Sequence, residues 1–104
     1  MTRAAFSMRL KKGFEKEYEK RHDEIWPELV KELEDAGVFD YSIYLEEETL
    51  TLFAFQKLKD HNSAGTLAEK AIVQKWWKYM GDIMETNEDS SPKVYPLKEV
   101  FHMD

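Results

Sequence analysis

Residues 4–22 of the chain read AAFSMRLKKGFEKEYEKRH, and a change of pattern inside this stretch decides the fold. From Ala4 to Leu10 the larger apolar side chains occupy every second position, which is typical of a strand with one buried face. After Gly13 the apolar spacing changes to three or four residues, which predicts a helix. The chain is therefore expected to begin with a strand that leads directly into a helix.

The predicted helix has an apolar stripe that extends well beyond the quoted stretch. Its members are Phe14, Tyr18, His22, Ile25, Leu29 and Leu33. Pro27 lies inside the stripe, and because proline has no backbone N–H, the helix either kinks there or restarts with Pro27 in its first turn. Gly37 is well placed to end the helix as a C-cap.

The middle of the chain predicts a β-hairpin. Apolar residues alternate with polar ones from Phe39 to Leu45, and the segment from Leu50 to Phe55 is rich in Thr, Leu and Phe. The acidic run Glu46-Glu47-Glu48 between them is expected to be a solvated turn.

The remaining third of the chain predicts a second helix and a final strand. Helical periodicity runs from about Asn62 to Met84, with Gly65 as an early candidate interruption. After the polar loop 87–92, a strand is expected from Val94 to Met103, with Pro96 suiting a sheet edge. The resulting βαββαβ order predicts an α+β, ferredoxin-like sandwich.

In this fold both helices cover one face of the sheet, and the other face needs a partner or must accept solvent. The second strand has Phe39, Tyr41, Ile43 and Leu45 on one side and Tyr44 on the other. This apolar and aromatic surface is more than a solvated face usually carries. The sequence therefore predicts a homodimer in which two sheets stack.

Length and composition indicate one domain spanning residues 1–104. A net charge of -6 without a basic patch argues against nucleic-acid partners, and no apolar run is long enough for a membrane span. The absence of cysteine excludes thiolate chemistry, and the N-terminus lacks the apolar core of a signal peptide. A cytoplasmic location is the expectation.

Tyr18 and His22 are the first candidate site residues. They are four positions apart and share the apolar face of the predicted helix, so two polar tips point inward. His22 either donates a hydrogen bond to a backbone carbonyl as a structural residue, or acts as a general acid or base, since free histidine titrates near pH ~6.5.

The pair Trp76-Trp77 is the second candidate. Adjacent residues differ by about 100° around a helix, so both rings reach the core only at the edges of a wide buried face. The pair packs in the core or at a dimer contact, or one indole forms a wall for a ligand such as a sugar. Trp76 is predicted for the wall, because Trp77 shares the stripe of Val73, Met80 and Met84.

Other chemistries lack support in the sequence. His22, His61 and His102 occur singly, without the spacing of a metal site. Neither a nucleophile elbow nor a glycine-rich phosphate loop is present.

Taken together, several segments resemble the L-rhamnose mutarotase family. These segments are Tyr18-x-x-x-His22, Ile25-Trp26-Pro27-Glu28-Leu29, Tyr41-Ser42-Ile43-Tyr44-Leu45, Trp76-Trp77-Lys78-Tyr79-Met80, Ser91-Pro92 and Glu99-Val100-Phe101-His102-Met103. They follow one another across nearly the whole chain. The resemblance implies a ferredoxin-like, dimeric α/β-barrel that interconverts the α and β anomers of L-rhamnose without a cofactor.

The resemblance also implies roles for individual residues. By position, His22 resembles the family's proton donor, and Tyr18, Tyr41, Trp76 and Trp77 resemble its sugar-binding residues. Mutarotation needs only proton transfer and positioning, and a histidine about 3 Å from the ring oxygen supplies the proton. The general base stays open between Tyr18, a bound water and a carboxylate.

Two alternative functions are compatible with the same fold class or with the same site residues. One is a cofactor-free monooxygenase or haem-binding dimeric α/β-barrel protein, in which His22 is a quinol base or an axial ligand. The other is a non-catalytic sugar-binding domain, in which His22 is structural. Divergence from the family in segments 11–16, 46–49 and 60–71 also leaves sugars related to rhamnose as substrates.

Overall fold

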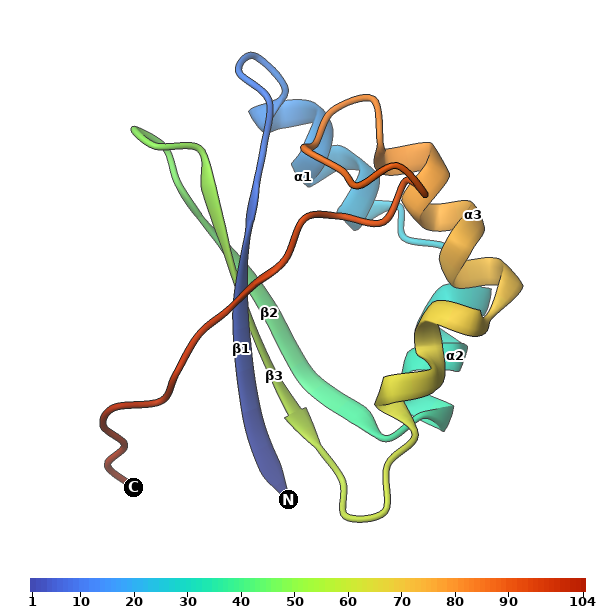
Figure 1. Cartoon of the computed structure of the whole chain (residues 1–104), viewed down its shortest axis with the longest axis vertical. Coiled ribbons are helices and arrows are strands. Elements are labelled where there is room, and N and C mark those ends of the chain that lie inside the picture. Colours follow the sequence, from blue (N-terminus) through green and yellow to red (C-terminus); the bar gives the residue numbers. More distant parts are fainter.

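The structure is a computed structural model that describes residues 1–104, and it confirms the predicted α+β fold. In chain order the elements are β1 (Thr2–Arg9), α1 (Glu15–Asp23), α2 (Pro27–Asp35), β2 (Val38–Glu46), β3 (Thr51–Leu58), the 3-10 helix η1 (Ala64–Glu69), α3 (Ala71–Met80) and β4 (Tyr95–Pro96). The sheet order is β2-β3-β1-β4, with every neighbouring pair antiparallel. All the helices lie on one side of the sheet (Figure 1).

The first helical region is divided at Pro27, as one of the two predicted alternatives states. Helix α1 ends at Asp23, and α2 begins at Pro27. Trp26 between them is extended, with φ −65° and ψ 128°, because a residue that precedes proline is disfavoured in the helical region. Helix α2 ends at Asp35 with Ala36 as its C-cap, and Gly37 follows with a positive φ of 92°, one position after the C-cap that was predicted at Gly37.

The prediction of one helical region from Asn62 to Met84 is wrong in extent. Its first part forms only the 3-10 helix η1, and Lys70 is extended, with φ −80° and ψ 133°, before α3 begins. Leu67 is the one large apolar side chain between residues 61 and 70, so a continuous helix would have little apolar face to bury there. Gly65 adds a further entropic cost to a regular helix.

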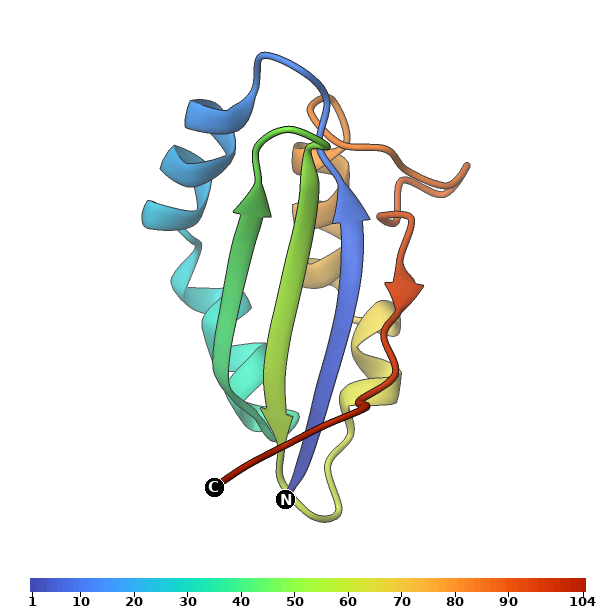
Figure 2. The same cartoon turned by 90° about the vertical axis from the view of Figure 1, so that its left-hand side faces the viewer.

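The prediction of a final strand from Val94 to Met103 is also wrong in extent. Only Tyr95 and Pro96 pair with β1, and the N–H of Leu97 then donates to the carbonyl of Ala5 at 3.0 Å. Pro96 has no N–H for a sheet ladder, which weakens pairing at this edge. The last residues leave the edge and cross the uncovered face of the sheet (Figure 2).

That uncovered face carries aromatic side chains. Tyr44 of β2 and Phe55 of β3 are 63% and 45% exposed, and their ring centroids are 5.9 Å apart. Figure 2 looks onto this face and shows no helix in front of it. Apart from the crossing of the C-terminal segment, one side of the sheet therefore has an apolar surface that the chain does not cover.

The apolar core lies between the sheet and the helices. Its buried members are Met8, Leu10, Tyr18, Leu29, Leu52, Ala54, Val73, Trp76, Met80, Ile83 and Met84. Only 16 of 104 residues are buried, and the space between the two layers is partly hollow. The helices have at most 10 residues, and none has the length and apolar character that crossing a membrane requires.

Candidate active site

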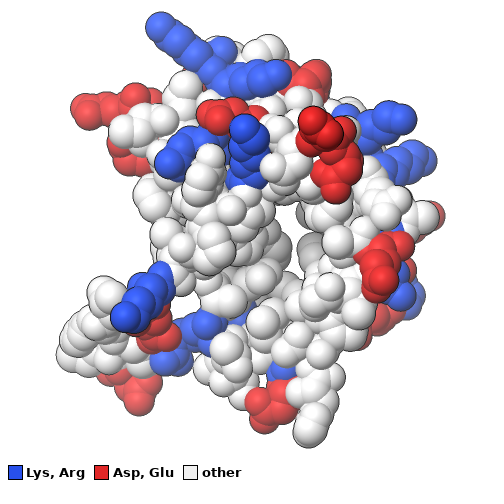
Figure 3. All heavy atoms as spheres, viewed as in Figure 1, with Lys and Arg blue, Asp and Glu red and all other residues white.

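The hollow between the sheet and the helices is a cavity of about 800 Å³. Of the 29 residues that line it, 20 are hydrophobic, and neither lysine nor arginine is among them. Figure 3 looks into this hollow, where the visible wall is mostly white and most of the coloured charged groups lie around the outside of the molecule. The charged members of the lining are the carboxylates Glu15, Glu19, Asp23 and Glu34, so the cavity disfavours an anionic ligand and suits one with an apolar face.

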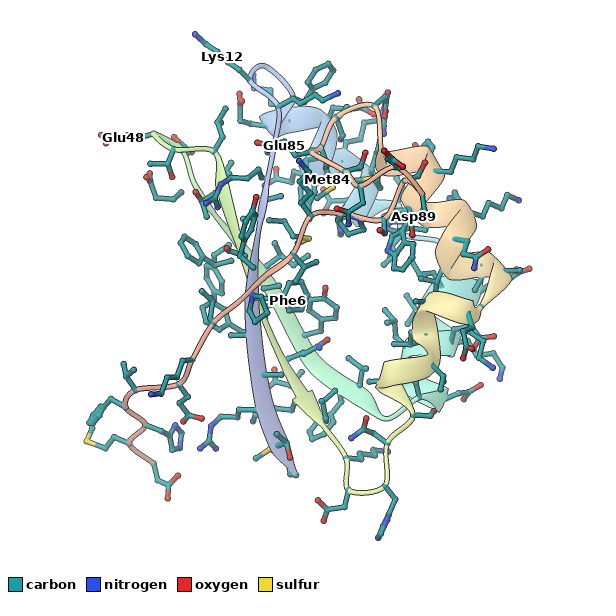
Figure 4. The ribbon with its side chains drawn as sticks, viewed as in Figure 1. Phe6, Lys12, Glu48, Met84, Glu85 and Asp89 are labelled. Atoms are coloured by element: carbon teal, nitrogen blue, oxygen red, sulfur yellow. The ribbon has the colours of Figure 1, made fainter.

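The five site residues predicted from sequence all line this cavity. They are Tyr18 and His22 from α1, Tyr41 from β2, and Trp76 and Trp77 from α3. Two of the other lining residues are labelled in Figure 4, which shows Phe6 midway along β1 and Met84 on the segment that follows α3. The structure therefore brings the predicted residues together from three separate elements.

His22 is held in place by Tyr18 and Trp76. Its Nδ1 atom is 3.1 Å from the backbone carbonyl oxygen of Tyr18. Its ring stacks on the Tyr18 ring with centroids 4.3 Å apart, and it meets the Trp76 ring edge-on at 5.5 Å. Burial lowers the pKa of His22, although the hydrogen bond to Tyr18 and the charge of Asp23 oppose this effect. The imidazole is therefore mainly neutral at pH 7.

The hydroxyls of Tyr18 and Tyr41 both have a raised pKa. Burial raises the pKa of Tyr18 far above its usual range, and the nearby Tyr41 hydroxyl raises it further. Burial likewise raises the pKa of Tyr41 to about 12. Both hydroxyls keep their protons at neutral pH, so each can donate to an oxygen of a ligand.

The two tryptophans differ from the sequence prediction in their packing. Trp76, not Trp77, shares the buried stripe of α3 with Val73 and Met80, and it is only 8% exposed. Trp77 is half-buried. The spacing Val73, Trp76, Met80 is as regular as Val73, Trp77, Met80, so periodicity did not separate the two. Both rings nevertheless line the cavity.

Two aromatic residues outside the predicted set pack against the ring of Trp76. Trp26 meets the Trp76 ring edge-on at 4.9 Å, and Tyr79 lies 5.6 Å from Trp76 and 5.4 Å from Trp26. Trp26 and Tyr79 both stand in segments that carry the family resemblance, but no local periodicity places them beside Trp76.

Arg21 was not singled out from sequence, although it joins α1 to the end of α3. Its Nη1 donates to the carbonyl of Tyr79 at 2.8 Å and to Asp82 at 2.9 Å, and its Nε donates to Glu17 at 2.7 Å. The Arg21 side chain is 11% exposed. Since Arg21 directly precedes His22, these bonds fix the helix that carries the imidazole.

The fold and the site together define a ferredoxin-like protein with an aromatic cavity, which contains a neutral histidine and two hydroxyl donors. Residues 3–103 match the model of the L-rhamnose mutarotase family. The chain belongs to the L-rhamnose mutarotase family, and it is therefore an isomerase.

Relatives across the whole chain agree with this assignment. An L-rhamnose mutarotase of Phocaeicola vulgatus is 62% identical, and one of Bacteroides thetaiotaomicron is 59% identical, with 100% of both chains covered in each comparison. The crystal structure of an L-rhamnose mutarotase from Formosa agariphila is 52% identical and superposes with a TM-score of 0.93 over 100% of both chains.

Proposed function

We propose that this chain, acting as one domain over residues 1–104, interconverts the α and β anomers of L-rhamnose. The observation that carries the proposal is the His22 imidazole at an aromatic cavity without basic residues, in a chain of this family. A neutral sugar needs no counter-charge, and its apolar ring face and methyl group match the indoles of Trp76 and Trp77.

In the proposed reaction His22 delivers a proton to the ring oxygen of the sugar. The bond between the anomeric carbon and the ring oxygen breaks, the anomeric hydroxyl loses its proton, and an open-chain aldehyde forms. Rotation about the neighbouring carbon–carbon bond presents the other carbonyl face, and reclosure gives the opposite anomer. Tyr18 and Tyr41 donate hydrogen bonds that orient sugar oxygens, since both hydroxyls stay protonated.

The test is exchange NMR on L-rhamnose with a catalytic amount of the protein. We expect faster exchange between the two anomeric proton signals than in buffer, and about 10² to 10⁴-fold less acceleration with His22→Ala. Circular dichroism establishes that the variant is folded. Exchange at the buffer rate with wild-type protein would refute the proposed activity. Rhamnose binding without acceleration would instead indicate a non-catalytic sugar-binding domain, and a spectral change on haem titration would favour the haem-binding alternative.

We also propose that the chain forms a homodimer by stacking the uncovered faces of two sheets, which gives a dimeric α/β-barrel. The exposed pair of Tyr44 and Phe55 supports this arrangement, because burying such aromatic rings favours association. Light scattering after size exclusion should give twice the mass of one chain for the wild type. Tyr44→Glu should shift the protein toward monomer, whereas Gln74→Glu on the exposed side of α3 should not. A monomeric wild type would refute the proposed dimer.

A further inference from the structure

The proposed function leaves one participant unassigned, namely the group that removes the proton from the anomeric hydroxyl. We propose that this base is His22 itself, so that one imidazole takes the proton from the anomeric oxygen and returns it to the ring oxygen. The proposal rests on the proposed function and on the geometry that fixes the histidine tautomer.

The tautomer follows from the contact with Tyr18. A carbonyl oxygen only accepts hydrogen bonds, so the Nδ1 atom of His22, at 3.1 Å from it, carries the hydrogen. In a neutral imidazole the second nitrogen, Nε2, then holds a lone pair. Nε2 makes no hydrogen bond within the chain. Every fully buried side-chain nitrogen has a hydrogen-bond partner, so Nε2 is not fully buried and is accessible to a ligand. The group therefore enters the reaction ready to accept a proton.

The other titratable groups around the cavity are poorer candidates. They are Glu15, Tyr18, Glu19 and Asp23 from α1, Glu34 from α2 and Tyr41 from β2. The two tyrosines keep their protons, as described above. Glu15 accepts the backbone N–H of Gly13 at 2.9 Å, and the carboxylate residues Glu19, Asp23 and Glu34 are exposed to solvent. Helix α3 and strands β1 and β3 contribute no titratable group to the lining.

The reaction balances with His22 as the single proton carrier. Nε2 takes the proton of the anomeric hydroxyl, the electron pair of that O–H bond forms the carbonyl, and the bond to the ring oxygen breaks with its electrons on that oxygen. The imidazolium then gives its Nε2 proton to the ring oxygen and is neutral again. The two oxygens share one carbon, so a small shift of the ring reaches both. Reclosure repeats the two transfers in the opposite order.

The pH dependence of the exchange rate tests this inference. If neutral His22 begins the reaction, the enzymatic rate falls by about tenfold per pH unit below the pKa of His22. If imidazolium began the reaction as the donor, the rate would instead increase as the pH falls. The exchange rate measured with His22→Ala, which includes the buffer reaction, is subtracted at each pH, because free sugar also mutarotates. A rate that increases toward acid would overturn the inference and leave the activity in place, whereas exchange at the buffer rate at every pH would refute the proposed function itself.

Two further measurements use residues that face the imidazole. Nitrogen-15 NMR of the wild type should show Nε2 without hydrogen and Nδ1 with hydrogen, and the reverse would contradict the tautomer. Tyr18→Phe keeps the backbone carbonyl that fixes the tautomer but removes the hydroxyl. It should weaken sugar binding and lower the catalysed exchange rate, but the exchange that remains at saturating rhamnose should still decrease toward acid pH. Remaining exchange that no longer decreases toward acid pH would contradict His22 as the base.

Discussion

Replacement of Arg21 by methionine should destabilise the protein by about 2 kcal/mol. Methionine keeps an apolar stem of similar length and removes the guanidinium, which is the part that joins α1 to the end of α3. The bond from Arg21 to the carbonyl of Tyr79 is charge-assisted and only 2.8 Å long, and such bonds contribute about 1.5 kcal/mol or more.

The two ion pairs of Arg21 contribute less. Asp82 is 64% exposed and Glu17 is 40% exposed, so solvent screens both pairs. Each is expected to be worth about 0.5 kcal/mol or less. Asp82→Asn should therefore have a smaller effect than Arg21→Met, because it leaves the bond to the Tyr79 carbonyl intact.

Thermal and urea unfolding followed by circular dichroism measure these effects. A loss of about 2 kcal/mol lowers the melting temperature of a domain of this size by about 10 °C. Lys31→Met is the matched control, since its ion pair with Asp35 joins two side chains that are 75% and 60% exposed on one helix. It should change stability little. If Arg21→Met has the same melting temperature as Lys31→Met, the guanidinium does not hold α1 against α3, and the reasoning is refuted.

Three further outcomes are expected. Gly37→Ala should destabilise the fold more than Gly13→Ala, because both glycines have positive φ but only at Gly37 would a Cβ meet the Cβ of Asn62 at 2.9 Å; equal melting temperatures would contradict this. Leu52→Ala should lower the free energy of unfolding, measured in urea, by about 2–5 kcal/mol, because Leu52 is 1% exposed in the core. A loss below about 1 kcal/mol would show that neighbouring side chains move in to fill the cavity left by the substitution. Stability should fall as the pH drops below about 6.5, because unfolded His22 then binds a proton that the folded, lowered-pKa imidazole still excludes; urea unfolding of the wild type at several pH values should show this slope, and His22→Gln should reduce it.

The sequence was most informative where one pattern had one structural solution. The alternation from Ala4 to Leu10 and the spacing of Tyr18 and His22 each fit a single arrangement, and the structure has both. Pro27 was informative but left two outcomes, because a missing N–H is compatible with either a kink or a restart. Packing of Trp26 at the restart is a tertiary effect that local pattern does not contain.

Other features depend on contacts that no local pattern records. Trp76 and Trp77 both continue a stripe from Val73, and the neighbouring Trp26 and Tyr79 determine which ring is buried. In the sequence, Arg21 is one more charged residue on a helix surface, because its partner Asp82 is 61 positions away. The final strand likewise ends at Pro96 although β1 continues to Thr2, and strand propensity does not measure where the chain leaves a sheet edge.

The hollow interior also links the stability of this protein to its ligand. In a chain of 104 residues, a cavity of about 800 Å³ replaces part of what would otherwise be packed core. A sugar that binds only the folded state adds about 2.7 kcal/mol to the unfolding free energy at one hundred times its dissociation constant. A sugar that binds this cavity should therefore raise the melting temperature as its concentration increases, and the size of that shift ranks candidate sugars before any catalytic assay.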